Sequence, residues 1–157
     1  MIEVGSALPA VAVDVSGDGE FVSIADQLDR PTLLIVFKRS CPTTKIAMPV
    51  YQHWAGYGPE VAVIGVSQDS KEETAEFFDE VGVDLPVVYD PPPYALSASL
   101  DLQSVPSLLL VEDGVVTWRG EGWQTATAVS LAERLASIAG SEPILVGADD
   151  LPPWKPG

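Results

Sequence analysis

Three apolar runs, each the length of a single β-strand, dominate the hydropathy pattern of this chain. They are Thr32–Phe37, Val61–Ser67 and Ser107–Val111, and each is rich in valine, isoleucine or leucine. A strand with one solvated face alternates apolar and polar residues, whereas continuous runs are typical of strands buried on both faces of a partly parallel sheet. Because both faces of such a sheet need covering, we expect an α/β protein with helices on either side.

The segments between these runs carry helix signals. Pro42 suits a first helical turn, where its missing N–H would have no partner, and we expect a helix from about Pro42 to Tyr57 that is kinked by Pro49. An amphipathic pattern predicts a second helix over Lys71–Val81, with Ser70 as its cap. The last long helix is predicted over residues 125–139.

Shorter elements are predicted around this frame. The Asp-Gly pair in 112–114 is a strong hairpin signal, so the third run should return as an antiparallel strand over Val115–Arg119. The other short elements are strands at Val11–Val15, Phe21–Val22 and Leu85–Tyr89, and helices at Ile24–Leu28, capped by Ser23, and at Tyr94–Leu100. This order predicts a mixed sheet with helices on both faces.

Length and charge narrow the class of protein. The chain has 157 residues, of which 46 % are hydrophobic, so we expect one folded domain and not a disordered chain. Its 23 acidic residues outnumber its 8 basic residues and give a net charge of −15. Such a surface repels phosphate backbones and anionic membranes, so nucleic acid is not expected as a partner.

The sequence has no segment typical of a membrane anchor or a leader. No apolar run approaches the ~20 residues that span a bilayer. The start, M-I-E-V-G-S-A-L-P, lacks the basic and apolar regions of a signal peptide, so we expect a cytoplasmic protein without membrane insertion. Cys41 is the only cysteine and His53 the only histidine, which predicts no internal disulfide, no His/Cys zinc site and no cofactor.

Cys41 follows the first apolar run and stands immediately before Pro42, at or near the N-cap of the predicted helix. Unpaired backbone N–H groups and the helix dipole stabilise negative charge at this position. Lys38, Arg39 and Lys45 are three of the eight bases and lie within four residues of the cysteine. They are expected to stabilise the thiolate, the nucleophilic form, further. The alternative interpretation is a buried, inert cysteine.

The stretch F-K-R-S-C-P-T-T-K-I-A-M-P resembles the active-site segment of thioredoxin-fold redoxins. It is most similar to the TlpA/ResA-like thiol–disulfide oxidoreductases and the related AhpC/TSA, peroxiredoxin-like group. Their pattern is a strand, a phenylalanine, Cys-Pro-x-Cys and a helix with a proline near its middle, which Cys41, Pro42 and Pro49 match. A second stretch, S-V-P-S, resembles the family's V-P-[ST] segment, whose proline is cis and packs opposite the cysteine. Pro106 corresponds to that proline.

The resemblance covers about residues 3–139. It implies a thioredoxin-like three-layer sandwich with a mixed central β-sheet and the extra strand-helix insert of TlpA/peroxiredoxin-like members. The expected organisation is a redoxin domain over residues 1–140, followed by a proline-rich tail over 141–157. We expect the tail to be irregular and to be held on the surface by Trp154, with coverage of the thiol as the alternative.

The chain departs from the dithiol pattern at two positions. Thr44 stands where the family has its second, resolving cysteine, so Cys41 could form a mixed disulfide but could not release the product alone. An external thiol, either glutathione or a dithiol protein, would have to do so. Thr44 could still donate its hydroxyl to the thiolate. Ile35 stands where thioredoxins keep a buried acid, so that proton acceptor is missing.

The resemblance implies a thiol–disulfide oxidoreductase that acts on a disulfide-bearing or oxidised substrate. The implied catalytic residues are Cys41, Thr44 and Pro106, and the implied substrate-binding residues are Val105, Pro42 and Ser40. A one-cysteine peroxidase with antioxidant activity is an alternative, although Lys38 replaces the Thr or Ser that peroxiredoxins have three residues before the cysteine, and their arginine is missing near Val105. A degenerate binding module that keeps only the fold is the third interpretation.

Overall fold

The computed structural model describes residues 1–157 and contains a seven-stranded mixed sheet with the strand order β2-β1-β5-β4-β3-β6-β7. The strands are β1 (Ala12–Asp14), β2 (Phe21–Ser23), β3 (Thr32–Phe37), β4 (Ala62–Ser67), β5 (Val87–Tyr89), β6 (Ser107–Glu112) and β7 (Val115–Glu121). The three predicted buried runs form β4, β3 and β6 and lie side by side within the sheet. β3 pairs parallel with β4 and antiparallel with β6, and every residue of β3 is buried.

The helices are α1 (Pro42–Trp54), α2 (Lys71–Val81), α3 (Ala95–Ser99) and α4 (Thr125–Ala139). The bounds predicted for α2 and α4 are confirmed. The Ser70 cap is also confirmed, since its hydroxyl accepts the Glu73 N–H at 3.1 Å. The first helix runs through Pro49 and ends as an α-helix at Trp54, after which the chain makes one 3-10 turn over Ala55–Tyr57. None of the helices is long and apolar enough to cross a membrane.

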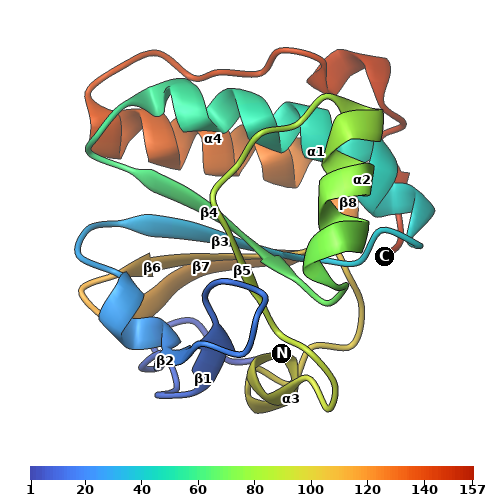
Figure 1. Ribbon diagram of the computed structural model, residues 1–157. Coiled ribbons are helices and arrows are strands. Elements are labelled where there is room, and N and C mark those ends of the chain that lie inside the picture. The colour runs from blue at the N-terminus through green and yellow to red at the C-terminus, as the bar shows by residue number, and fades with distance from the viewer.

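Alternate residues of β3 point to opposite faces of the sheet and build two hydrophobic cores. Leu33, Ile35 and Phe37 face the layer of α1, α2 and α4, which Figure 1 shows above the sheet. Leu34 and Val36 face the opposite side, where α3 and a 3-10 turn over Ile24–Gln27 pack against the sheet. The predicted thioredoxin-like three-layer arrangement, with helices on both faces, is therefore confirmed.

Several short elements differ from their predicted bounds. The segment predicted as helix Ile24–Leu28 is a 3-10 turn over Ile24–Gln27, and the Ser23 side chain makes no capping hydrogen bond. The strand predicted from Leu85 begins at Val87, and the helix predicted from Tyr94 begins at Ala95. These ends depend on tertiary partners. For example, the buried carboxylate of Asp90 accepts the N–H groups of Leu96 and Ser97 at 3.0 and 2.9 Å.

The C-terminal segment is not irregular throughout, as the sequence predicted, but contains two short elements. A 3-10 turn covers Ala148–Asp150, and a two-residue strand, β9 (Trp154–Lys155), pairs antiparallel with β8 (Trp123–Gln124). Proline lacks an N–H but keeps its carbonyl as an acceptor. Accordingly, the carbonyl of Pro153 accepts the backbone N–H of Thr125 at 2.9 Å. The segment is therefore ordered by backbone hydrogen bonds despite its prolines.

The turn after β1 is organised by one buried carboxylate. Asp14 accepts the backbone N–H groups of Ser16, Gly17 and Glu20 with Oδ1 and that of Gly19 with Oδ2, at distances of 2.9–3.3 Å. Desolvation by burial raises the pKa of Asp14, but these N–H donors outweigh it and hold the pKa below its ordinary value.

Replacing Asp14 with asparagine should therefore destabilise the fold by about 1–3 kcal/mol at neutral pH, because the ionised acceptor is lost. A carboxyl group whose folded-state pKa is lowered stabilises the fold above its unfolded-state pKa of ~3.9, and this stabilisation is lost as the pH falls through the folded-state value. Urea unfolding of wild type and Asp14→Asn at pH 7 and pH 3 measures the effect. The stability difference should narrow at the lower pH, and a constant difference would contradict the assignment.

Candidate functional site

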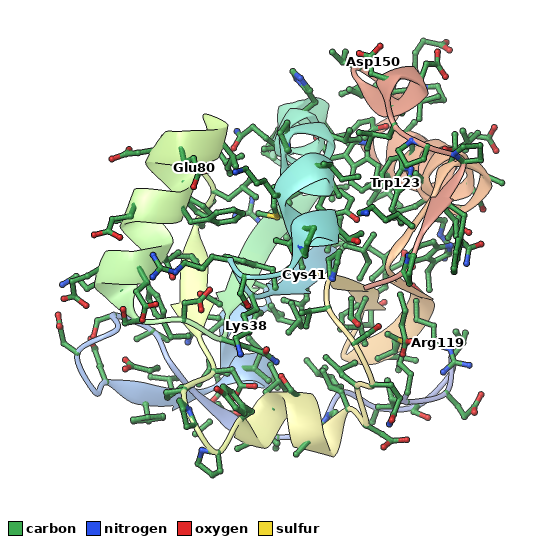
Figure 2. All side chains as sticks on the ribbon, turned by 90° about the vertical axis from the view of Figure 1, so that its right-hand side faces the viewer. Lys38, Cys41, Glu80, Arg119, Trp123 and Asp150 are labelled. Atoms are coloured by element: carbon green, nitrogen blue, oxygen red, sulfur yellow. The ribbon has the colours of Figure 1, made fainter.

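Cys41 occupies the N-cap of α1, directly after the loop that leaves β3. Its thiol donates a hydrogen bond to the backbone carbonyl of Val105 at 3.1 Å, and the Val105–Pro106 peptide bond is cis. The sheet brings these distant segments together: Val36 at the end of β3 pairs with Ser107 at the start of β6. Figure 2 shows Cys41 at the beginning of α1.

The residues predicted to surround Cys41 differ in their exposure. Ser40 and Pro42, which flank it, are exposed, while Val105 is half-buried and Pro106 is buried. Cys41 itself is half-buried. The structure thus brings Cys41, Val105 and Pro106 together at one edge of the sheet.

Two buried hydroxyl groups on α1 lack hydrogen-bond partners. Thr44, in the position of the missing second cysteine, has no exposed surface, and its Oγ1 has no partner. The same is true of the Tyr51 hydroxyl, which lies seven residues further along the helix and therefore on the same face. Desolvation and, to a lesser extent, the charge of Cys41 raise the pKa of Tyr51, so its phenol keeps its proton. Ile35, where thioredoxins keep a buried acid, lies in the same hydrophobic core as Tyr51 and adds no polar group.

Two of the three basic residues that were expected to add positive charge near the thiol are engaged in ion pairs. Arg39 forms ion pairs at 2.9 and 3.1 Å, and Lys45 forms another, all with carboxylates on the neighbouring helix α2. The partners are Glu73, Glu76 and Glu80. Lys38, which Figure 2 shows near Cys41, has no carboxylate partner. Of the three cations, only Lys38 therefore keeps a charge that no carboxylate balances, while the start of α1 places the helix dipole beside Cys41.

The C-terminal segment reaches this site. The residue that anchors it differs from the sequence-based prediction, which was Trp154. Trp154 is 62 % exposed, so its side chain does not anchor the segment. Trp123 does, since its indole is buried and its Nε1 donates to the carbonyl of Pro152 at 2.9 Å. Beyond β9, the hydroxyl of Thr43 donates to the carbonyl of Pro156. Thr43 was not among the predicted site residues, because only its partner on the far segment reveals its role.

Two hollows adjoin the loops that flank the thiol. One, of about 220 Å³, is lined by Gln68 and residues 102–105 of the cis-proline loop. The other, of about 480 Å³, is lined in part by Lys38, Gln68 and Tyr89. Neither is lined by residues of the C-terminal segment. No group of three or more His, Cys, Asp or Glu side chains is arranged to hold a metal ion.

Comparisons with solved structures show the same fold. A protein from Chlorobium tepidum described as the thiol:disulfide interchange protein DsbE superposes with a TM-score of 0.74 at 19 % identity and covers 89 % of this chain and 100 % of its own. A protein from Bacteroides thetaiotaomicron described as a protein disulfide isomerase superposes with a TM-score of 0.75 at 17 % identity, and the match covers 90 % of this chain and 92 % of its own. A protein from Corynebacterium glutamicum described as a thiol-disulfide isomerase superposes with a TM-score of 0.66 at 23 % identity, and the match covers 85 % of this chain and 97 % of its own.

The sequence comparisons are consistent with this structural likeness. No curated protein sequence matches the chain. A family model, that of the redoxins, matches residues 3–135 and so includes both Cys41 and the Val105–Pro106 segment. The match spans most of the chain, and the thioredoxin-like sheet and the facing cysteine and cis-proline lie within it. The chain therefore belongs to the redoxin family.

Proposed function

We propose that this redoxin is a single-cysteine thiol–disulfide oxidoreductase that works through mixed disulfides with an external resolving thiol. The observation that carries the proposal is the contact between the Cys41 thiol and the Val105 carbonyl, at 3.1 Å beside the cis peptide bond. A half-buried thiol at a helix N-cap is placed to react, and the adjacent backbone can pair with a bound substrate. Ser40 and Pro42 would border the bound disulfide.

The exchange needs two steps. In the first, the Cys41 thiolate attacks one sulfur of a disulfide R–S–S–R′, a Cys41–S–S–R bond forms, and R′–S⁻ leaves and takes a proton from solvent. In the second, an external thiolate R″–S⁻ attacks the sulfur carried by R, which releases R–S–S–R″ and restores the Cys41 thiolate. The R′ half of the substrate is reduced to a thiol, and the external thiol is oxidised into the disulfide R–S–S–R″. Glutathione or a dithiol protein could supply that thiol.

Thr44 would assist the first step without supplying a second sulfur. In the resting state the thiol proton is bonded to the Val105 carbonyl, and the Thr44 hydroxyl has no partner. A thiolate can no longer donate to that carbonyl but can accept a hydrogen bond. The Thr44 hydroxyl, buried in the same first turn, is free to provide one.

The peroxidase alternative needs an arginine near the thiol, and no arginine of the chain is available for that role. Arg119 is the nearest candidate on the β6–β7 hairpin, and its Nη1 donates to the backbone carbonyls of Met1 and Ile2 at 2.9 and 2.8 Å. Its guanidinium is therefore committed to the N-terminal segment.

Incubation with oxidised glutathione tests the proposal. We expect one glutathione per chain, bound to Cys41 and visible by intact-mass spectrometry, because a single sulfur can form the mixed disulfide but not resolve it. Addition of reduced glutathione or dithiothreitol should remove it and restore the free thiol. If no adduct forms in the folded protein while the unfolded chain is modified readily, the domain is a binding module and not an oxidoreductase.

A further inference from the structure

The residues Trp154–Gly157, which we call the strap, run across the face that carries Cys41. Figure 1 shows the C-terminal segment in red, passing along the layer of α1 and α4 before it descends to β8. There Trp154 pairs with Gln124 and Lys155 with Trp123. The strap thus forms a strand on the free edge of β8.

The last residues of the strap meet the two segments that border the thiol. The Thr43 hydroxyl, two residues after Cys41, donates to the Pro156 carbonyl. Gly157 lies against the carbonyl oxygen of Val105, so closely that a Cβ atom at this position would overlap that oxygen. The same oxygen accepts the Cys41 thiol at 3.1 Å. One backbone oxygen therefore contacts both the reactive sulfur and the strap.

The close approach depends on a second glycine beneath the strap. Gly122 has a φ of +61°, and a Cβ atom there would lie 2.8 Å from the Lys155 carbonyl oxygen and 2.9 Å from the Gly157 nitrogen. Glycines at both positions leave the room that the backbone contacts require. The close packing of the strap therefore depends on one glycine within it, Gly157, and on one glycine beneath it, Gly122.

We propose that the strap occupies the position where an extended polypeptide would add beside Val105, so that Cys41 reacts faster with low-molecular-weight disulfides than with disulfides in polypeptide chains. The inference rests on the proposed function for its chemistry. A peptide that adds as a strand needs main-chain hydrogen bonds and space along the partner backbone. Here Gly157 fills the space at Val105, and Pro156 uses the Thr43 hydroxyl. The hollow of about 220 Å³ that is lined by Gln68 and residues 102–105 of the cis-proline loop has no lining residue from the strap, so a small molecule can still approach Val105 from that side.

The strap is held weakly enough to detach from the face that carries Cys41. Trp154, Pro156 and Gly157 are exposed and Lys155 is only half-buried, so the strap is held mainly by backbone contacts and one side-chain hydrogen bond. Segments with few buried contacts open by local fluctuation. A polypeptide disulfide would react only through the open fraction, and its rate would fall in proportion. A small disulfide would react with both states.

Two disulfides with the same leaving group test this selectivity. One is the 2-thiopyridyl disulfide of 2-mercaptoethanol, and the other is the 2-thiopyridyl disulfide of a ten-residue peptide with one central cysteine. In both, the Cys41 thiolate attacks the sulfur of the carrier, and the released 2-thiopyridone is followed by its absorbance. The wild-type protein should react faster with the small disulfide than with the peptide, beyond the ratio measured for a free cysteine derivative.

Two substitutions should raise the peptide rate. Gly157→Ala introduces the overlap with Val105, and Thr43→Val removes the hydrogen bond to Pro156. Each should speed the peptide reaction about three- to tenfold, the effect of one lost hydrogen bond, and leave the small disulfide within about twofold. The matched controls are Gly56→Ala, whose Cβ would make only an ordinary contact at 3.8 Å, and Thr43→Ser, which keeps the hydroxyl. Both should behave as wild type.

A readout without redox chemistry separates the two proposals. Alkylation of Cys41 by iodoacetamide and by a maleimide attached to the same peptide should show the same selectivity and the same response to Gly157→Ala. If that response appears while glutathione adducts are neither formed nor resolved, the oxidoreductase function fails and the strap stands. If the peptide reagents react equally with wild type and both variants, or if small and large reagents speed up together, the strap does not restrict access and the inference is overturned.

Discussion

Replacing Cys41 with serine should abolish catalysis of disulfide exchange. The rate of exchange should fall by at least about a thousandfold, to that of the uncatalysed reaction. The hydroxyl of serine is almost fully protonated at neutral pH and cannot form the mixed disulfide, and the sequence contains no other thiol. The measurement is the rate at which wild type and Cys41→Ser reduce a small disulfide with glutathione in excess.

The fold should tolerate this change, because Cys41 is half-buried and lies outside both hydrophobic cores. Urea unfolding of the two proteins should give similar midpoints. A Cys41→Ser protein that is equally folded and equally active would remove Cys41 from the reaction and, with it, the proposed mechanism.

Replacing Thr44 with cysteine should convert the site into a dithiol that needs no external thiol for resolution. Thr44 is completely buried, its hydroxyl has no partner, and a cysteine has nearly the same volume, so the substitution should fit. The second sulfur would attack the mixed disulfide within the same molecule. Release of glutathione should then be faster by at least about a hundredfold than resolution of the wild-type adduct by millimolar thiol.

Rapid mixing with oxidised glutathione, followed by acid quench and mass spectrometry, measures this change. Thr44→Cys should accumulate an internal disulfide between Cys41 and the introduced cysteine and no adduct, whereas the control Thr44→Ser should accumulate the adduct as wild type does. A Thr44→Cys protein that retains a long-lived adduct would mean that position 44 does not face the sulfur of Cys41. The role proposed for the Thr44 hydroxyl would then fail as well.

The parts of the site that could be predicted are those encoded by neighbouring residues. A continuous apolar run, a cysteine and a proline at a helix start specify the strand–thiol–helix unit around Cys41, because strand burial and helix initiation depend on local pattern. The bounds of α2 and α4 follow for the same reason. The approach of the Val105 segment to Cys41 was expected only from the family resemblance, because the β3–β6 pairing that brings them together joins segments far apart in the chain.

The charge of the site could not be predicted from composition near Cys41. Arg39 and Lys45 are close to the thiol in sequence, but their charges are balanced by glutamates of α2 that lie more than thirty residues away. Six of the eight basic side chains form ion pairs with carboxylates in the folded chain. In a chain with 23 acidic residues, packing decides which cations remain free, and Lys38 is one of them.

Residue patterns along the chain are enough to specify the α/β class, the buried strands and the position of the single thiol at a helix start, since each depends on hydrophobic period and capping over a few residues. The other groups that surround this thiol are set by contacts between distant segments of the folded chain. The bond between Thr43 and Pro156 spans 113 residues, and the contact of Gly157 with Val105 depends on the path of the whole C-terminal segment. Local patterns carry no information on such pairs, because backbone groups of any sequence can make them once the fold brings them together.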